Sequence, residues 1–217
     1  MMYTRNASGG YDAQCTVGFN AKSTVDAKWY VLTAGHCGSP GTTFYVYQRR
    51  TGRFHVLGHM HRCIWGGPGS GCVYAADDDE GIITIDNVPG WDPKPWVYVH
   101  AWTGPVAGTT TDPGYPIYGT EGSRLGLRVC VSGAISGTSC GNVEQLGGGS
   151  LARVDLCADH GDSGAPIFSY QKARGLLKGA NGAEPGQPAP GRCQDRLYQG
   201  ITEATQRLHV AVALALP

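Results

Sequence analysis

Three short segments of the chain carry residue types that together could perform acyl transfer. His36 follows an apolar run, an acidic run occupies residues 77–80, and Ser163 stands in the glycine-rich hexapeptide 161–166. A serine hydroxyl is a weak nucleophile until an imidazole accepts its proton. The imidazole in turn needs a carboxylate to fix its tautomer and stabilise its cation. The order histidine, aspartate, serine is one of the known orders of a catalytic triad.

The glycines on either side of Ser163 suit a nucleophile. Glycine permits tight backbone geometry, so such a turn can project the hydroxyl into a cleft and aim N–H groups at one point. Those groups would form an oxyanion hole, the donors that stabilise the charged oxygen of a tetrahedral intermediate. Taken alone, the hexapeptide could be an ordinary glycine-rich surface turn. The histidine and the acidic run upstream favour the catalytic interpretation.

Short apolar runs separated by turn residues must position these groups. The runs predict strands at residues 15–19, 29–34, 43–47, 54–57, 82–85, 96–99, 125–130, 150–154, 166–169 and 175–177. This spacing favours an all-β barrel or sandwich. Only the C-terminal end is predicted to be helical, with Thr202 as the N-cap of a helix that includes residues 203–207. The Gly/Thr/Pro-rich stretch 103–122 is a candidate crossing between two halves.

Composition excludes some partners. The 217 residues are enough for one large all-β domain or two small ones that share a core. Lys plus Arg and Asp plus Glu both number 17, so the formal net charge is zero. No global field therefore attracts nucleic acid or an anionic membrane. Because no run of 18 or more apolar residues occurs, we expect no transmembrane helix and no membrane partner.

Eight cysteines without a Cys-x-x-Cys pair favour four disulfides and an oxidising compartment. The spacing alone leaves about 105 pairings open. The residues at the N-terminus lack the apolar segment of a signal peptide. We therefore expect a processed or re-engineered mature segment of a secreted protein, with the signal and any pro-region absent from this chain.

In combination, these segments resemble the chymotrypsin-like serine proteases, most closely the bacterial streptogrisin and α-lytic protease branch. The resemblance spans about residues 8–217. Its motifs are Thr33-Ala34-Gly35-His36-Cys37, Asp79-x-Gly81-Ile82, Val129-Cys130-x-Ser132-Gly133, Cys157-Ala158-x-x-Gly161-Asp162-Ser163-Gly164 and Gln199-x-Ile201-Thr202-Glu203-Ala204. It implies an all-β fold of two packed six-stranded antiparallel β-barrels with a short C-terminal helix. Residues 1–217 would form a single peptidase domain, with an N-terminal barrel at about 8–102 and a C-terminal barrel at about 123–217.

The resemblance also implies roles for individual residues. His36 would be the general base and acid, and Ser163 the nucleophile. Asp79 would orient the imidazole, because it alone of the acidic run lies two residues before the Gly81-Ile82 pair. Asp77 and Asp78 would then form a solvated turn. The oxyanion hole would consist of the backbone N–H groups of Gly161 and Ser163.

The expected function is that of a secreted serine endopeptidase that works through an acyl-serine intermediate without cofactor or metal. A protein or peptide is the expected substrate, and a protein protease inhibitor is a second candidate partner. We expect a monomer. The alternative from another class is a catalytically silent homologue that acts as a binding module.

One disulfide pattern follows from the resemblance. It pairs Cys15 with Cys37, Cys130 with Cys140, and Cys157 with Cys193. Cys63 and Cys72 are left to pair with each other, and their bridge would close a Gly/Pro-rich loop just ahead of Asp79.

Substrate specificity depends on the predicted S1 pocket, the site for the residue before the scissile bond (P1). The residues expected to line it are Leu156, Ala158, Leu177, Lys178, Gly179 and Ala180. This apolar wall favours an apolar P1 residue. Asp155 offers an alternative, because trypsins place their specificity aspartate two residues before the matching cysteine. Otherwise Asp155 is a buried aspartate that accepts backbone hydrogen bonds.

Departures from the family pattern motivate the silent alternative. Lys178 stands where the family has a serine that lines S1 and supports the catalytic aspartate. Val131 replaces an arginine that pairs with the aspartate before the nucleophile. Asp162 therefore needs another partner, for which Arg128, Arg153 or a free N-terminus are candidates. Ala180 replaces a glycine and would narrow the pocket.

The remaining histidines admit two interpretations each. His55, His59 and His61 lie near Cys63, and His59-x-His61 on one strand would place two imidazoles on one face. Because Cys63 is better used in a disulfide and no further ligand is evident, we expect surface histidines and no metal. His160 either touches substrate or is a solvated loop residue.

Overall fold

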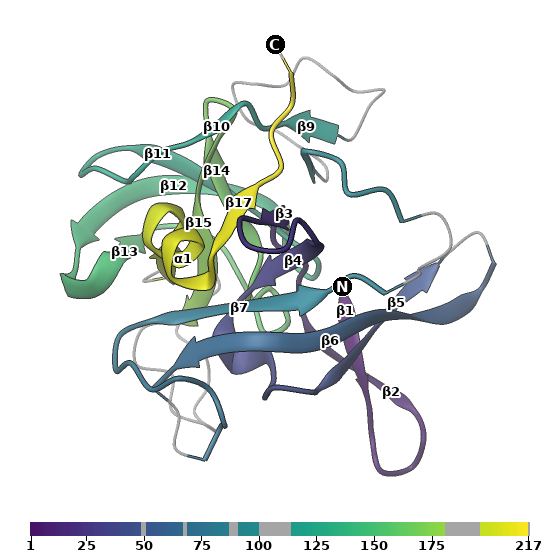
Figure 1. Cartoon of the computed structure of the whole chain (residues 1–217). Coiled ribbons are helices and arrows are strands. Elements are labelled where there is room, and N and C mark those ends of the chain that lie inside the picture. Colours follow the sequence, from purple (N-terminus) through teal and green to yellow (C-terminus); the bar gives the residue numbers. More distant parts are fainter. Residues whose placement is uncertain (49–50, 67–68, 87–90, 100–113, 181–195, 217) are drawn as a thin grey trace.

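The computed structural model describes residues 1–48, 51–66, 69–86, 91–99, 114–180 and 196–216, and its strands form two large sheets (Figure 1). The first sheet has eight strands in the order β17-β3-β4-β7-β6-β5-β1-β2. Its strands are β1 (Met2–Arg5), β2 (Tyr11–Cys15), β3 (Asn20–Ser23), β4 (Trp29–Thr33), β5 (Thr43–Gln48), β6 (Arg53–Trp65), β7 (Asp79–Thr84) and β17 (Val210–Val212). We call this sheet the N-terminal lobe.

The second sheet is a closed barrel, which we call the C-terminal lobe. Six antiparallel strands follow one another around it in the order β15-β14-β11-β12-β13-β16, and a further pairing of β16 with β15 closes the ring. A seventh strand, β10, joins β15 in parallel. The strands are β10 (Gly119–Thr120), β11 (Arg128–Gly133), β12 (Gly137–Leu146), β13 (Leu151–Val154), β14 (Pro166–Ser169), β15 (Lys172–Ala180) and β16 (Arg196–Gly200).

Smaller elements complete the described part of the chain. They are the antiparallel pair β8 (Trp96–Tyr98) and β9 (Gly114–Pro116), the 3-10 turns η1 (Gly35–Cys37) and η2 (Gly148–Ser150), and the helix α1 (Ile201–Leu208). Helix α1 contacts β15 and β16 of the C-terminal lobe as well as β7 and β17 of the N-terminal lobe. The predicted all-β fold with a short C-terminal helix is thus present. The N-terminal lobe has eight strands, since β17 and the β1–β2 hairpin extend its edges.

A hydrophobic cluster joins the two lobes. It includes Leu32 and Ile82 of the N-terminal lobe, Phe168 and Leu176 of the C-terminal lobe, and Leu208 of α1, each at most 3% exposed. Burial of large apolar side chains stabilises a contact by roughly 1.5–3 kcal/mol per residue. The cluster therefore fixes how the loops at the junction face one another.

Two local expectations were wrong. Residues 16–19 are not a strand: the N–H of Thr16 donates to the carbonyl oxygen of Ser163 (2.8 Å), and that of Gly18 donates to Leu32 (2.9 Å). Because its N–H groups bond to two different neighbours, this segment cannot pair with a single strand. Thr202 is not the N-cap, because β16 runs directly into α1 with Gly200 as the cap residue.

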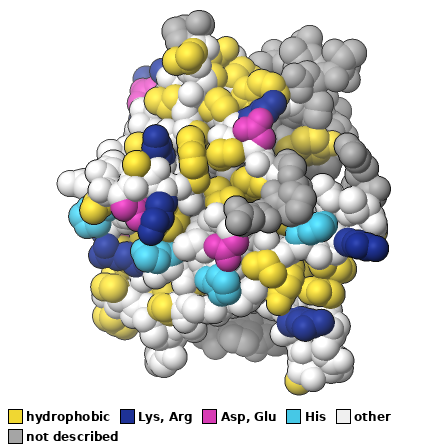
Figure 2. Space-filling model, turned by 45° about the vertical axis from the view of Figure 1, so that its right-hand side comes forward, with side chains coloured by type: hydrophobic (Ala, Val, Ile, Leu, Met, Phe, Trp, Pro, Cys, Tyr) yellow, Lys and Arg dark blue, Asp and Glu magenta, His cyan; other side chains and the backbone are white. Residues whose placement is uncertain are grey.

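The surface shows no concentration of one charge on the face drawn in Figure 2. There, acidic and basic side chains are scattered, with hydrophobic side chains between them. This agrees with a formal net charge of zero. Among the described residues, no helix has the length and apolar character needed to cross a membrane.

A close backbone contact holds the turn around Ser163 against the N-terminal lobe. Gly164 has a φ of +82°, and a Cβ atom there would overlap the Thr33 hydroxyl and lie 2.9 Å from the backbone nitrogen of Ala34. The N–H of Gly164 donates to the carbonyl oxygen of Leu177 (2.7 Å). Only glycine satisfies both the left-handed conformation and the lack of space.

We predict that Gly164→Ala destabilises the protein more than Gly126→Ala. Gly126 has a φ of +72°, but a Cβ atom added there would meet nothing within 4 Å, so alanine adds only backbone strain. That strain costs about 1–2 kcal/mol. At Gly164 the overlap should bring the loss to about 3 kcal/mol or more. Denaturant unfolding measures both free energies, and equal losses would contradict the close contact.

Candidate active site

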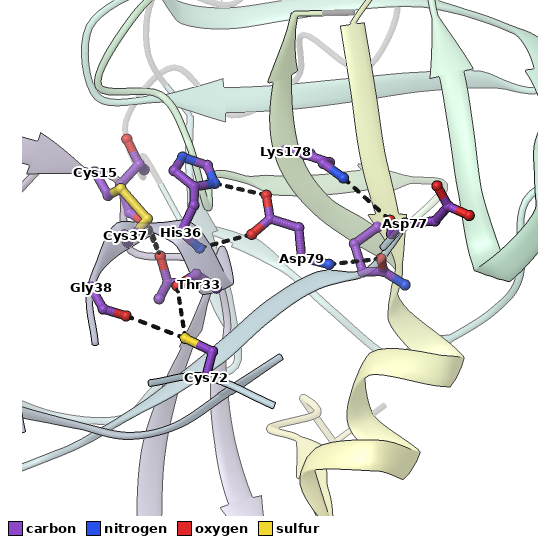
Figure 3. Close-up of polar contacts among 12 residues, drawn as sticks. Cys15, Thr33, His36, Cys37, Gly38, Cys72, Asp77, Asp79 and Lys178 are labelled. Atoms are coloured by element: carbon purple, nitrogen blue, oxygen red, sulfur yellow. Dashed lines mark hydrogen bonds and ion pairs between the residues drawn. A yellow bond between two sulfur atoms is a disulfide. The ribbon is translucent and has the colours of Figure 1, made fainter. Parts of the chain in front are cut away.

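The element that follows β4 positions His36. Strand β4 ends at Thr33, and η1 then turns the chain so that His36 leaves the sheet. The disulfide between Cys15 and Cys37 ties this turn to the end of β2 (Figure 3). The His36 side chain is 28% exposed, so one edge of the imidazole can reach solvent or a ligand.

Both carboxylate oxygens of Asp79 accept hydrogen bonds from His36. It is the first residue of β7 and is fully buried. Its Oδ2 accepts the Nδ1–H of His36 at 2.7 Å, and its Oδ1 accepts the backbone N–H of the same residue at 2.8 Å (Figure 3). With the proton held on Nδ1, the neutral imidazole has Nε2 free to accept a proton.

The electrostatics of this pair favour a charged imidazole. Burial alone would lower the pKa of His36, but the charge and the hydrogen bond of Asp79 outweigh it. The net result is a pKa raised above the ordinary value of 6.5. The ammonium of Lys178 acts in the opposite direction and lowers the pKa of His36.

Ser163 lies on a turn flanked by two glycines with positive φ, Gly161 at +93° and Gly164 at +82°. The neighbouring N–H groups of the turn all find acceptors: Asp162 donates to Asp159, Gly164 to Leu177 and Ala165 to Asp162.

Two N–H groups of the same turn differ from their neighbours. Within the described residues, those of Gly161 and Ser163 donate to no protein acceptor. They are the pair expected to form the oxyanion hole. No hydrogen bond joins the Ser163 hydroxyl to His36 in the described part of the structure. Such bonds often tighten only when a ligand is present.

Backbone amides replace the expected arginine beside Asp162. This carboxylate is fully buried and accepts the N–H groups of Ile135 (2.8 Å), Ser136 (3.3 Å) and Asp159 (2.9 Å). Gly133 is required here, because a Cβ atom would overlap the carboxylate. The turn that carries Ser163 is thereby anchored to the loop after β11.

The three predicted partners of Asp162 were Arg128, Arg153 and the N-terminus. Arg153 pairs with Glu144 at 3.6 Å. No ion pair joins Asp162 to Arg128 or Arg153 in the described part of the chain. The amino group of Met1 interacts electrostatically with Asp162, although burial lowers the pKa of that amine. Val131 is fully buried among apolar residues of the barrel.

Lys178 contacts the acidic run through the backbone. Its Nζ donates to the carbonyl oxygen of Asp77 at 3.3 Å (Figure 3). It therefore restrains the segment just ahead of Asp79 and also acts on His36 by its charge. A serine at this position could not reach across in the same way.

The residues predicted to line S1 lie in or next to the barrel core. Leu156, Ala158 and Leu177 are at most 2% exposed. Gly179 has a φ of +148°, close to an irregularity in the β15–β16 pairing, and the side chain of Ala180 lies outside the described part of the chain. Asp155 is exposed, so its interpretation as a buried aspartate is wrong.

Three of the expected disulfides are present in the structure. They are Cys15–Cys37, Cys63–Cys72 and Cys130–Cys140. The fourth, Cys157–Cys193, involves Cys193, which lies outside the described residues. Cys72 Sγ lies 3.9 Å from the carbonyl oxygen of Gly35 and 3.8 Å from that of Gly38, so this bridge packs behind the turn that carries His36.

The histidines His59 and His61 have separate partners. His59 pairs with Asp86 at 3.1 Å, whereas the ring of His61 lies 5.3 Å from that of Tyr30. In the described part, the one group with metal-ligand geometry contains Cys15 and Cys37, whose sulfurs are already joined in a disulfide. His160 is exposed.

Sequence reasoning missed the partners of the acidic run. Asp78 is not a solvated residue: its side chain is 14% exposed and pairs with Arg207 of α1 at 2.8 Å. The same guanidinium pairs with the fully buried Glu80 at 2.6 Å. The sequence did contain one signal of these partners. Adjacent strand residues such as Asp79 and Glu80 point to opposite faces, so Glu80 needs a partner other than His36.

We predict that Asp162→Asn destabilises the protein by about 1–3 kcal/mol. Both carboxylate oxygens accept backbone N–H groups, so in either orientation the amide nitrogen of asparagine must face a donor. The matched control is Asp26→Asn, since Asp26 is exposed and accepts the N–H of Lys28 (3.2 Å). Unfolding free energies should change little in the control. Equal effects would contradict the anchoring role.

Comparisons with known proteins place this geometry in a family. The chain is 31% identical over 186 residues to Serine protease 2 of Streptomyces fradiae, covering 81% of this chain and 91% of that protein. It is 30% identical over 190 residues to Streptogrisin-C of Streptomyces griseus, covering 83% of this chain. Because the match covers 34% of Streptogrisin-C, the chain spans about a third of that relative.

Solved structures give the same fold. The protease of Nocardiopsis superposes with a TM-score of 0.68 at 23% identity, covering 98% of this chain and 96% of that one. No family model matches the chain. Together with the sequence relatives, this likeness shows that the chain belongs to the chymotrypsin-like serine proteases, in the streptogrisin branch.

Proposed function

We propose that the chain is an active serine endopeptidase with His36, Asp79 and Ser163 as its catalytic triad. Family membership supplies the chemical class. The observation that supports activity in this chain is the pair of N–H groups at Gly161 and Ser163 that lack acceptors among the described residues. They lie in a turn packed against the end of β4, the strand that leads into His36, and the His36 imidazole and backbone are held by two hydrogen bonds to Asp79.

The proposed reaction follows from this geometry. His36 Nε2 removes the proton of Ser163 as the oxygen attacks the peptide carbonyl carbon, and the carbonyl oxygen becomes an oxyanion. The N–H groups of Gly161 and Ser163 stabilise that charge, while Asp79 stabilises the imidazolium. The imidazolium then gives its proton to the leaving amine. Water, deprotonated by the same imidazole, hydrolyses the acyl-serine and restores the enzyme.

We propose an apolar P1 preference and a secreted location. The exposed Asp155 supports the first over the trypsin-like alternative, because a specificity carboxylate would lie at the base of a pocket. Disulfides support the second, since they persist in oxidising compartments. The substrate would be a protein or peptide, and a protein inhibitor that mimics it would bind at the same residues.

Labelling with a fluorophosphonate probe tests the proposal. We expect the folded protein to react at one serine, and both Ser163→Ala and heat-denatured protein to remain unlabelled. A peptide library should then show cleavage after apolar residues, whereas cleavage after Lys or Arg would favour the Asp155 alternative. A folded protein that neither reacts nor cleaves would instead be the silent homologue that acts as a binding module.

The charge of Lys178 generates a pH prediction. The acid limb of kcat/KM reports the protonation of the catalytic imidazole. Because the ammonium lowers the pKa of His36, Lys178→Met should raise that pKa further and move the acid limb to higher pH. The matched control is Lys28→Met, whose exposed lysine pairs with Asp26. A shift to lower pH, or none, would refute the effect.

A further inference from the structure

We propose that Arg207 of α1 is a positioning residue for Asp79, acting through both neighbours of that aspartate in the chain. This inference deepens the proposed function and rests on it. It concerns a cluster formed by α1, the start of β7 and the turn η2, on the side of β7 that faces away from His36.

The guanidinium bridges the residues on either side of Asp79. Its Nη2 lies 2.8 Å from Asp78 Oδ1, and its Nε lies 2.6 Å from Glu80 Oε1. Residues that alternate along a strand point to opposite faces, so Asp79 faces His36 while Asp78 and Glu80 face α1. The Nε contact with Glu80 is a hydrogen bond, and the Nη2 contact with Asp78 is an ion pair. The planar guanidinium can hold these positions in a fixed geometry that a lysine ammonium cannot reproduce.

A second set of contacts leads from the same guanidinium to the backbone of Asp79. Arg207 Nη2 donates to Ser150 Oγ at 3.3 Å, and Gln199 Nε2 donates to the same oxygen. The Oε1 of Gln199 then accepts the backbone N–H of Asp79 at 3.3 Å. Arg207 thus contacts the residues before and after Asp79 directly, and it is linked to the amide of Asp79 through Ser150 and Gln199.

Burial makes this cation necessary. Asp79 and Glu80 have no exposed surface, and Asp78 adds a third negative charge beside them. Burial raises the pKa of Glu80 to about 7, although the charge and hydrogen bond of Arg207 oppose the rise. Without the guanidinium, the pKa of Glu80 would rise further, so Glu80 would be neutral, and the start of β7 would lose the partner that joins Asp78 to Glu80 and would be held less firmly.

A shift of Asp79 has a measurable consequence at His36. The charge and hydrogen bond of Asp79 raise the pKa of His36, against the effect of burial. If Asp79 is held less firmly, that contribution weakens and the pKa of His36 falls. A loss of overall stability would instead reduce the amount of folded protein and leave the pKa of the folded fraction unchanged.

The sharpest variant is Ser150→Gly. Ser150 has a φ of +85°, so glycine relieves backbone strain while removing the hydroxyl that links Arg207 to Gln199. We expect a thermal midpoint close to that of the parent protein. The pKa of His36, measured by NMR titration of the imidazole, should nevertheless fall. Arg207→Lys, which keeps the charge but loses the fork, should lower it as well.

The kinetic constants of Ser150→Gly and Arg207→Lys should also change. When rates are normalised to the fraction of protein that a fluorophosphonate labels, kcat should fall about 10- to 100-fold in both variants, with a much smaller change in KM. The acid limb of kcat/KM should move to lower pH.

The matched control is Arg174→Lys. Arg174 is also buried, donates to Ser169 (2.8 Å) and pairs with Glu121 (3.1 Å), but neither partner is part of the cluster around Asp79. It should lose stability without a change in the His36 pKa.

The outcomes separate this inference from the proposed function. An unchanged His36 pKa in both Ser150→Gly and Arg207→Lys would overturn the positioning role, even if the parent protein is active. A parent protein that takes up no fluorophosphonate would overturn the proposed activity. A fall of the His36 pKa in that same protein would still support the positioning of Asp79 by Arg207.

Discussion

The buried carboxylate of Asp79 is the constraint on which the rest of the site depends. A buried charge is tolerated only when hydrogen bonds and opposite charge compensate for the lost water. Here both oxygens are engaged by His36, one through the ring and one through the backbone. Strand β7 lies between β4 and β6, and Thr33 pairs with Gly81. The histidine that leaves the end of β4 therefore arrives beside the aspartate that begins β7.

Ser163, the proposed nucleophile, comes from the other lobe, so its placement needs a separate explanation. The hydrophobic cluster between the lobes sets their general approach, and the backbone contact at Gly164 sets it locally. Thr16 contributes from the N-terminal lobe, since its N–H donates to the carbonyl oxygen of Ser163 and its hydroxyl donates to that of Gly161. These contacts hold the turn in place, while two of its N–H groups have no acceptor in the described structure.

Much of this arrangement could be predicted from the sequence, because the motifs around His36, Asp79 and Ser163 are local and specific. Apolar runs also predicted strands such as β4 and β14 closely. The failures concern contacts between distant parts of the chain. Residues 16–19 have strand-like composition, yet Ser163 and Leu32 take their hydrogen bonds. Asp78 lies in an acidic run typical of a solvated turn, yet it pairs with Arg207, which lies near the other end of the sequence. Composition carries no record of such a partner.

The direct test of the proposed mechanism is a crystal structure of the protein after reaction with a small fluorophosphonate. We expect a covalent bond to Ser163 Oγ and a phosphoryl oxygen within hydrogen-bond distance of the N–H groups of Gly161 and Ser163. His36 should remain bonded to both oxygens of Asp79. An adduct whose phosphoryl oxygen points to solvent, or a His36 turned away from Asp79, would contradict the mechanism.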